Sequence, residues 1–380
     1  MLKSFSVKNY KNFKDKLTVD FSATGSYRFN PDCVDNGLIS KMLIYGRNAT
    51  GKSNLGSAIM DVQGVLFGYR PNAEVFLNAD SDDKDAFFEY EFLLGKDLLK
   101  YSYRCDEKRQ LFEEQLTLND KNVFKIDFEN NKYDINLKLV NAETVVIDVY
   151  RNMIEDSKQQ ESEEKQLPFL RWLANNAAFN SNSPIIRLCN YVRSMRMQSI
   201  RFNMEKLPAV SYDSFYDLLS KNGNLKDFEE FLNEMGIKCQ LILEPLPDGK
   251  NELYFKHKRP IPFAGNASSG TIALMNLYRT IIVPASMASF FYMDEFDAFY
   301  HYEMSDKVIR FIKSHFPKCQ FVMTTHNTNL MTNRLMRPDC LMILSEYGTI
   351  TALCDATERE LREGHNLEKM YISGEFDKYE

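Results

Sequence analysis

Residues 46–53 read Gly-Arg-Asn-Ala-Thr-Gly-Lys-Ser, which fits the pattern G-x-x-x-x-G-K-[ST]. A short apolar run, Met42–Tyr45, precedes this stretch and is typical of a buried parallel strand, and a helical pattern from about Ser53 to Val65 follows it. In that setting the glycines let the backbone wrap around phosphate groups, while successive N–H groups and the helix N-terminus supply partial positive charge. The stretch therefore predicts a P-loop, a phosphate-binding loop between a strand and a helix.

The side chains of this loop have separate predicted roles. Lys52 is expected to reach the β- and γ-phosphates of ATP, and Ser53 is expected to give its hydroxyl to Mg²⁺. A chance glycine-rich turn is the alternative, but the flanking strand and helix argue against it. We therefore expect ATP and Mg²⁺ as cofactors. The other predicted nucleotide contacts are Gly46, Arg47, Asn48, Ala49, Thr50, Gly51 and Asn54.

A second motif supplies carboxylates. Residues 290–295, Phe-Phe-Tyr-Met-Asp-Glu, form an apolar strand that ends in two acids. Neighbouring side chains on a strand point in different directions, so the two acids can do different work. Asp294 is predicted to hold Mg²⁺, directly or through water, and Glu295 to act as the general base that polarises the attacking water. The alternative interpretation is that the two acids only cap a helix. The presence of a P-loop in the same chain favours the catalytic interpretation.

Two further segments point to the same chemistry. The apolar strand Phe321–Thr325 is followed by His326, which we expect near the γ-phosphate because strand carboxyl ends line the ligand crevice of a parallel sheet. A capping or core-edge histidine is the alternative. Ser268-Ser269-Gly270 precedes a helical run and forms a second candidate anion site, although Ser-Ser-Gly is also a common N-cap. Such a site is most useful if it closes over the nucleotide of a partner subunit.

The composition bounds the class of protein. The chain has 380 residues, of which 44% are hydrophobic and 26% are charged, as in ordinary globular proteins. No apolar run is long enough to span a bilayer, so we expect a cytoplasmic protein without a membrane partner. The formal net charge of −6 means that any nucleic-acid surface must be local. Seven cysteines without a Cys-x-x-Cys pair indicate reduced thiols.

Periodicity along the chain predicts a mixed architecture. Leu2–Phe21 reads as two strands, and the middle of the chain is predicted to be helical at Ile185–Arg201 and Ser211–Met235. From Gly265 onwards helices and strands alternate, which is typical of a parallel sheet. Alternating segments that predict an antiparallel sheet are Phe87–Leu94, Leu99–Cys105, Leu111–Leu118, Val123–Phe128 and Lys132–Leu137.

Taken in order, these motifs resemble the ATPase head of the ABC-type group that includes the RecF, SMC and OLD-family proteins. The opening residues 2–13 are similar to the first strands of that group. Within it, the chain looks most like the standalone AAA-like ATPases of bacterial anti-phage systems, such as the ATPase subunits of PARIS, Septu and RloA-type systems. Three stretches carry that closer resemblance: Ser268–Thr271, Thr324–Leu330 and Asn366–Gly374.

The resemblance implies an α/β fold, a P-loop NTPase head of the ABC type with an antiparallel β subdomain and a helical insertion. It divides the chain into residues 1–140 (N-terminal half of the head, with the P-loop and β subdomain), 141–236 (helical insertion) and 237–380 (C-terminal half). It also implies a D-loop around Phe296–Tyr300. The Q-loop glutamine stays unassigned between Gln63 and Gln115.

Partners also follow from the resemblance. It implies a signature motif at Ser268–Gly270 that contacts ATP held by another subunit, so a homodimer or higher homo-oligomer is expected. His326 would be the switch histidine. Because nothing after His326 is long enough for the Toprim nuclease of OLD proteins, a separate nuclease-like effector is expected.

The middle segment contains Arg187, Arg193, Arg196 and Arg201 among apolar residues. Their spacing predicts that the first three share one broad helix face, which could bind nucleic acid or an acidic partner. A solvated helix face is the favoured alternative.

Three functions remain open at this stage. The first is an ATP-binding and ATP-hydrolysing switch subunit of an anti-phage defence system, which oligomerises on ATP and controls a separate effector. The second is a RecF-like ATPase of DNA repair or recombination, against which the acidic net charge counts. The third is a scaffold that binds ATP with little turnover, against which the Asp294-Glu295 pair argues.

Overall fold

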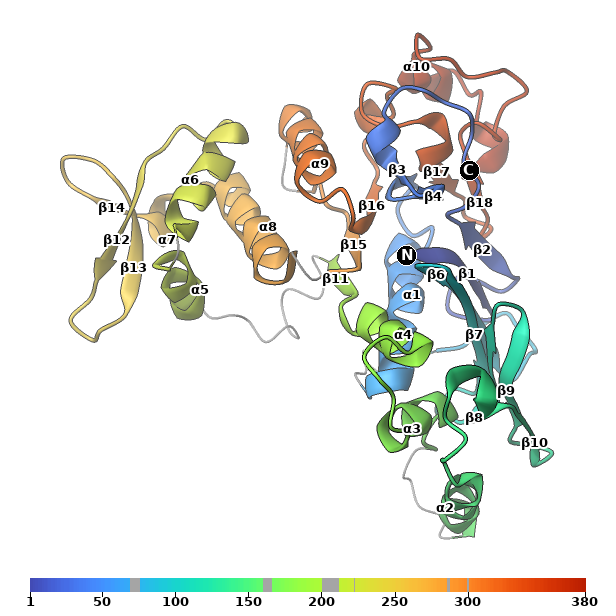
Figure 1. Cartoon of the computed structure of the whole chain (residues 1–380). Helices are drawn as coiled ribbons and strands as arrows, with labels where there is room; N and C mark the ends of the chain where they lie inside the picture. The colour runs from blue at the N-terminus through green and yellow to red at the C-terminus, as the bar shows by residue number, and fades with distance from the viewer. Residues whose placement is uncertain (69–75, 160–165, 200–211, 222, 286–287, 299–300) are drawn as a thin grey trace.

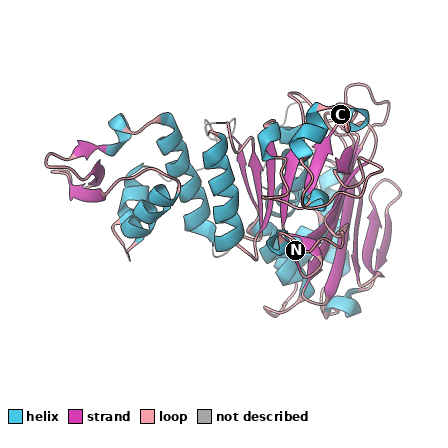
Figure 2. Ribbon diagram, turned by 90° about the horizontal axis from the view of Figure 1, so that it is seen from above, coloured by secondary structure: helices cyan, strands magenta, loops and turns pink. Residues whose placement is uncertain are grey.

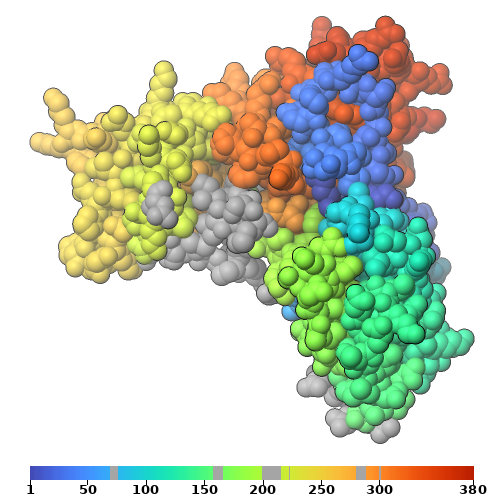
Figure 3. All heavy atoms as spheres, viewed as in Figure 1, coloured from blue at the N-terminus to red at the C-terminus, as the bar shows by residue number. Residues whose placement is uncertain are grey.

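A computed structural model describes residues 1–68, 76–159, 166–199, 212–221, 223–285, 288–298 and 301–380. Two sheets form a body, and a smaller lobe built between residues 212 and 285 projects from it (Figure 1). The space-filling view shows the same lobe, in yellow, standing apart from the N-terminal and C-terminal segments (Figure 3). The body therefore combines residues from both ends of the chain.

The larger sheet is antiparallel throughout. Its strands alternate buried and partly exposed side chains, as expected for a sheet with one covered face. The two strands predicted at the N-terminus and the predicted antiparallel sheet are both confirmed. In sheet order the strands are β10 (Lys132–Ile135), β9 (Lys121–Asp127), β8 (Leu111–Leu118), β7 (Asp97–Cys105), β6 (Ala86–Leu94), β1 (Leu2–Lys8) and β2 (Leu17–Asp20).

The second sheet is parallel apart from its last strand, and its central strands are buried along their whole length. Parallel sheets are covered on both faces, which explains the continuous apolar runs in the sequence. The carboxyl ends of these strands meet at one edge of the sheet. In sheet order the strands are β11 (Arg196–Ser199), β15 (Phe290–Asp294), β16 (Gln320–Thr325), β5 (Lys41–Tyr45), β17 (Leu341–Leu344) and β18 (Ile350–Ala352).

Helix α1 (Lys52–Phe67) lies between the two sheets. On one side, the Tyr90 hydroxyl of β6 donates to the Ala58 carbonyl at 2.9 Å. On the other, Gly56 packs so closely on Tyr292 of β15 that a Cβ there would lie 2.5 Å from the ring. The helix that begins at the P-loop is thus held by both sheets.

The segment after the antiparallel sheet corrects one prediction. Helix α4 (Pro184–Arg193) ends at Arg193, whereas the sequence pattern predicted a helix over Ile185–Arg201. Residues Arg196–Ser199 instead form strand β11, which pairs in parallel with β15. This pairing with a strand about a hundred residues later outweighs local helical periodicity. The other helices here are α2 (Ile147–Gln159) and α3 (Phe169–Asn176), and residues 200–201 lie outside the described part.

The projecting lobe has a core of aromatic rings. Phe228 lies 4.8 Å from Tyr278 and 6.1 Å from Phe263, between ring centroids. Phe231 extends this cluster to Phe311 of helix α9 (Tyr302–His315), 4.9 Å away, so the lobe is attached to the body through α9. Figure 2 shows α8 and α9 as adjacent helices beside the parallel sheet. The lobe contains α5 (Tyr212–Leu219), α6 (Asn224–Glu234), β12 (Leu241–Pro245), β13 (Asn251–Phe255), β14 (Ile261–Pro262), α7 (Phe263–Asn266) and α8 (Ser269–Ala285).

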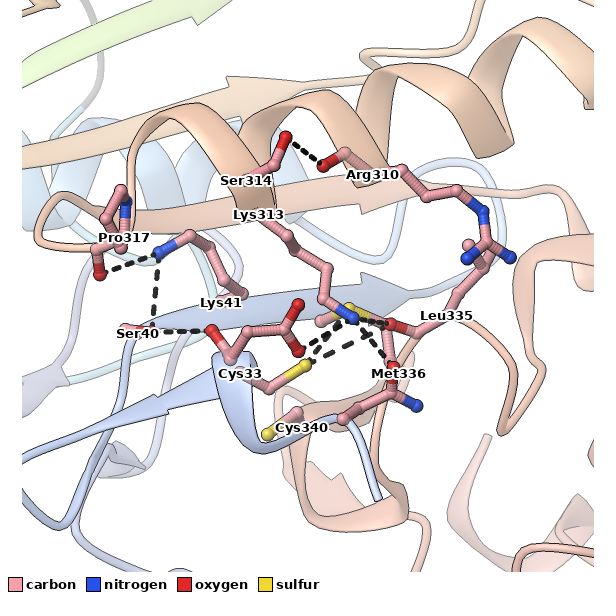
Figure 4. Close-up of polar contacts among 12 residues, drawn as sticks. Cys33, Ser40, Lys41, Arg310, Lys313, Ser314, Pro317, Leu335, Met336 and Cys340 are labelled. Carbon is pink, nitrogen blue, oxygen red and sulfur yellow. Dashed lines mark hydrogen bonds and ion pairs between the residues drawn. The ribbon is translucent and has the colours of Figure 1, made fainter.

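Two buried lysines fasten the segments that flank β5 (Figure 4). The Lys313 ammonium of α9 donates to the Leu335 carbonyl at 2.6 Å and pairs with Asp32 at 3.0 Å. The Lys41 ammonium donates to the Cys319 carbonyl at 2.9 Å, and burial lowers its pKa to about 8. These contacts join segments from the N-terminal and C-terminal parts of the chain beside the parallel sheet.

The remaining elements are short. Two paired strands of two residues each, β3 (Val34–Asp35) and β4 (Leu38–Ile39), precede β5. Helix α10 (Leu367–Ile372) lies near the C-terminus. In the described residues no helix is both long and apolar enough to cross a membrane. The 3₁₀ turns are η1 (Pro31–Cys33), η2 (Leu137–Val140), η4 (Thr328–Leu330), η5 (Pro338–Cys340) and η6 (Asp377–Tyr379).

Candidate nucleotide-binding site

The loop between β5 and α1 needs its glycines. Gly51 has a φ of 100°, and a Cβ there would lie 3.1 Å from Cβ of Asn12, so both backbone conformation and space exclude a side chain. A Cβ on Gly46 would lie 2.7 Å from the Thr50 hydroxyl and 3.0 Å from the Leu344 carbonyl oxygen. The loop therefore folds tightly, with α1 starting directly after Gly51.

Lys52 is the first residue of α1, and its ammonium turns back into the loop. It donates to the carbonyls of Gly46 at 2.6 Å and Arg47 at 2.9 Å. Burial lowers the pKa of this lysine, and the nearby carboxylates of Glu295 and Asp294 oppose that effect. A charged amine held inside the loop is the group that phosphate oxygens would bind.

Ser53 and Asp294 meet although they are far apart in the chain. The Ser53 hydroxyl donates to Oδ2 of Asp294 at 2.6 Å, and the Thr324 hydroxyl donates to Oδ1 of the same carboxylate at 3.0 Å. The pair joins the start of α1 to the end of β15, and Thr324 comes from the neighbouring β16. The strand ends thus bring both predicted metal ligands to one place.

Glu295 follows directly and is half-buried. Its backbone N–H donates to the Thr324 hydroxyl at 2.8 Å, and its φ is 48°. A glutamate in the left-handed region is uncommon, and such residues gather at functional sites. The positive φ of Glu295 comes directly after the end of β15 at Asp294, so the backbone turns at the residue that follows the predicted metal ligand.

His326 and Asp297 lie beside this pair of acids. His326 is exposed and follows β16 directly, at the same sheet edge as Asp294. Asp297 is buried, and its Oδ2 accepts a hydrogen bond from the Thr325 hydroxyl at 2.7 Å, while its Oδ1 has no hydrogen-bond partner among the described residues. Burial raises the pKa of Asp297, and the Thr325 hydroxyl opposes that rise. The resemblance placed Asp297 within the predicted D-loop, Phe296–Tyr300, but gave this residue no role of its own. In the predicted D-loop, residues 299–300 lie outside the described part.

The Ser-Ser-Gly segment lies elsewhere, at the start of α8 in the projecting lobe (Figure 1). The Ser268 hydroxyl accepts a hydrogen bond from the Thr271 N–H at 3.1 Å, so Ser268 caps the helix. Among the described residues, no hydrogen bond or ion pair joins Ser268, Ser269 or Gly270 to the P-loop. Its predicted contact with another subunit's ATP stays a prediction.

Asn12 is a residue that sequence reasoning missed. Its side-chain Nδ2 donates to the Ala49 carbonyl at 3.3 Å, and its side-chain Oδ1 accepts a hydrogen bond from Asn54. The turn between β1 and β2 therefore packs directly against the P-loop. On the same side, the exposed Arg47 forms an ion pair with Glu380. Neither partner could be found from the motif, because both contacts join segments distant in sequence.

The predicted arginine face is wrong. Arg187 pairs with Asp97 and donates to the Leu94 carbonyl at 2.7 Å, so it fastens α4 to the antiparallel sheet. Arg193 lies over the Phe67 ring at 4.8 Å. Arg196 is on β11, and Arg201 lies outside the described residues. The helix ends too early for these residues to share a face.

Neither glutamine considered for the Q-loop contacts the P-loop. The Gln63 amide donates to the carbonyls of Val192 at 2.7 Å and Met195 at 3.0 Å, so it fixes the end of α4 against α1. Gln115 is on β8 in the antiparallel sheet. The Q-loop therefore stays unassigned.

The residues present fit Mg²⁺ and ATP. A serine hydroxyl and a carboxylate in contact at 2.6 Å supply the hard oxygen ligands that Mg²⁺ prefers. The loop supplies backbone N–H groups, the start of α1 and the Lys52 ammonium for the phosphates. Ser53 and Asp294 would hold the metal, and Lys52 would contact the phosphates.

The fold and this site define an ABC-type P-loop ATPase. The family model described as "AAA domain, putative AbiEii toxin, Type IV TA system" matches residues 41–332, and the chain belongs to this family of ATP-binding proteins. No curated protein matches the chain.

Similarity to one solved structure supports the fold, and two others are similar over most of the chain. The chain is similar to an SMC head bound to the C-winged helix domain of ScpA, with 15% identity, a TM-score of 0.50, and coverage of 90% of this chain and 93% of that one. An SMC head with an extended coiled coil, bound to the C-terminal domain of ScpA and derived from Pyrococcus furiosus, matches at 16% identity, covers 93% and 96%, and has a TM-score of 0.47. The SMC head of Thermotoga maritima matches at 15% identity, covers 92% and 98%, and has a TM-score of 0.46.

Proposed function

We propose that this chain is an ATP-hydrolysing switch, whose engagement with a second copy of itself depends on bound ATP. The observation that carries the proposal is the contact of Ser53 with Asp294, with Lys52 and Glu295 beside it. Two pairs of neighbouring residues, one at the start of α1 and one at the end of β15, meet at the carboxyl edge of the parallel sheet. This is the set needed to bind a nucleoside triphosphate and to activate water against its terminal phosphate.

The residues would divide the work as follows. Bound Mg²⁺ neutralises charge on the phosphates. Lys52 exchanges its two loop carbonyls for phosphate oxygens, and Ser53 and Asp294 hold the metal. Glu295 accepts the proton of the attacking water, and its backbone is fixed for this by the hydrogen bond to Thr324. His326 senses the γ-phosphate from the end of β16.

A second copy would complete the site. Ser268-Ser269-Gly270 lies at the start of α8 in the lobe, and among the described residues no hydrogen bond or ion pair joins it to the P-loop of its own chain. In a two-fold pair, each such segment would contact the ATP held by the other copy, so the interface forms twice and closure is cooperative in ATP. Hydrolysis would remove the γ-phosphate and open the pair.

We place this switch in the bacterial cytoplasm, in a defence system that controls a separate, nuclease-like effector. The family description names a putative AbiEii toxin of a type IV toxin–antitoxin system, which supports a place in a system of that kind. Lys52, Ser53, Asp294 and Glu295 support the ATPase role, so on this proposal the chain would supply the timing while a partner supplies the toxic activity.

The test uses Glu295→Gln and Lys52→Ala in parallel. Glu295→Gln should lower ATP turnover by about 10²-fold or more while ATP still drives association, measured as native mass with and without ATP. Lys52→Ala should lose both turnover and association, because it removes the phosphate contact itself. Undiminished turnover in Glu295→Gln would remove this residue from the role of base. Association without turnover in the wild-type chain would instead favour the ATP-dependent scaffold.

A second candidate function, a nucleic-acid-stimulated ATPase of the RecF type, has one supporting observation. Four exposed basic residues, Lys256-His257-Lys258-Arg259, form the turn between β13 and β14, and none of them has an ion-pair partner in the described chain. On this account DNA would raise ATP turnover, and the effect would fall steeply between 50 and about 200 mM salt. Turnover unchanged by DNA, or by Lys258→Ala with Arg259→Ala in its presence, would exclude this candidate.

A further inference from the structure

The P-loop has two chemically different sides. β16 and β15, which carry the groups for the γ-phosphate, lie on one side of β5, and β17 lies on the other. If the proposed function holds, the terminal phosphate of ATP lies at Asp294 and Glu295. The phosphate chain of ATP would then run along the P-loop, and the nucleoside would lie beyond the loop on the side of β17.

The β17–β18 turn, residues 345–349, lies on that side at the same sheet edge. β17 is parallel to β5, with Ile343 opposite Tyr45, so the turn begins where the P-loop begins. A Cβ on Gly46 would lie 3.0 Å from the Leu344 carbonyl oxygen, and a Cβ on Gly348 would lie 3.4 Å from the Asn12 carbonyl oxygen. The turn is therefore packed against both the start of the P-loop and the Asn12 turn that contacts it.

Tyr347 is the exposed residue of this turn. Its side chain is 81% exposed, the largest value among the exposed large hydrophobic residues of the described chain. Its phenol interacts with the neighbouring Glu346 carboxylate, which raises the pKa of the phenol. In the described part of the chain its ring packs against no other aromatic ring, so its face is open to a planar ligand.

The backbone holds this tyrosine in place. The Gly348 N–H donates to the Ser345 carbonyl at 3.2 Å, and the Thr349 N–H donates to the Ser345 hydroxyl at 3.1 Å. Gly348 has a φ of 74°, which suits glycine and closes the turn. A tight turn with an exposed aromatic tip gives a preformed surface for stacking.

We propose that Tyr347 is the base-stacking residue of the nucleotide site, with its ring lying against the purine of bound ATP. The inference rests on the proposed function and adds to it the recognition of the nucleoside. Aromatic side chains stack on bases whatever their hydrogen-bonding edge, so this contact would favour nucleotides over bare phosphates without strong choice between adenine and guanine.

The experiment compares ATP with inorganic tripolyphosphate, which has the phosphates and no base. Mg²⁺-dependent binding of each is measured by calorimetry for the wild type, Tyr347→Ala and Tyr347→Phe. We expect Tyr347→Ala to weaken ATP binding about tenfold and to leave tripolyphosphate binding unchanged, while Tyr347→Phe binds both like the wild type. Tyr254→Ala, in the distant three-stranded sheet, is the matched control and should change neither.

Several outcomes would overturn the inference. Unchanged ATP affinity in Tyr347→Ala would show that the ring does not contact the base. An equal loss for ATP and tripolyphosphate would show a role in shaping the P-loop instead. These results leave the proposed function standing, whereas a wild-type chain that binds neither ligand would remove both. Because the side chain is exposed, the variants should fold normally, which thermal unfolding checks.

Discussion

Replacing Arg109 by methionine should destabilise the protein by about 3 kcal/mol, at the lower end of the range for breaking a buried ion pair. Arg109 pairs with Asp61 of α1, with Nη1 and Oδ1 2.5 Å apart, and the two side chains are only 14% and 0% exposed. Without the guanidinium, the Asp61 carboxylate stays buried with one hydrogen bond, from the Tyr103 hydroxyl at 2.8 Å. That remaining bond places the expected loss at the lower end.

Urea unfolding of the wild type and the variant measures this loss, and an exposed ion pair provides the control. Lys8 and Asp83 are 2.7 Å apart but about half exposed, so Lys8→Met should change stability by no more than about 0.5 kcal/mol. Joining Arg109→Met with Asp61→Leu should recover most of the loss, because no unpaired charge remains buried. If Arg109→Met and Lys8→Met had equal effects, burial would not govern this pair and the reasoning would be refuted.

Two further predictions concern single carboxylates. Glu295 has a φ of 48°, which glycine adopts more easily than alanine. Glu295→Gly should therefore be more stable than Glu295→Ala by about 1 kcal/mol in urea unfolding, although both variants lack the base. Equal stabilities of the two variants would mean that the backbone is unstrained. Burial raises the pKa of Glu114 to about 7, above its value of about 4.3 in the unfolded chain, so the contribution of Glu114 to stability should fall as the pH rises from about 4 to 7. Glu114→Gln cannot ionise, so its stability relative to the wild type should rise over that window by on the order of 3 kcal/mol, and a gap that does not change with pH would contradict the assignment.

The parts of this molecule that sequence predicted are those set by local pattern. The P-loop motif marked the start of α1, because only glycine fits at Gly46 and Gly51. Alternation marked the strands of the antiparallel sheet, because one face of it is covered. The apolar runs before Asp294 and His326 marked the buried parallel strands. In the two sheets the apolar pattern of the sequence follows from which strand faces are buried. At the P-loop the glycines follow from the close contacts around the loop.

What sequence could not predict depends on contacts between distant segments. Residues 196–199 pair with β15, and this non-local pairing ended a helix that local periodicity extended. Asn12 acts on the P-loop through a turn about forty residues upstream, which no spacing rule connects to the motif. Tyr347 is notable only once β17 is known to lie beside β5. These residues surround the motif in space and not in sequence.

The central claim is that Ser53 and Asp294 share one Mg²⁺ on the same ATP that Lys52 holds. Equilibrium binding of ATP, measured with Mg²⁺ and with a chelator, tests it most directly in the wild type and in Asp294→Asn. We predict that Mg²⁺ strengthens ATP binding to the wild type and that Asp294→Asn abolishes this gain while keeping the metal-free affinity. If Mg²⁺ strengthened ATP binding by the same factor in Asp294→Asn, the metal would lie elsewhere and the account would be contradicted.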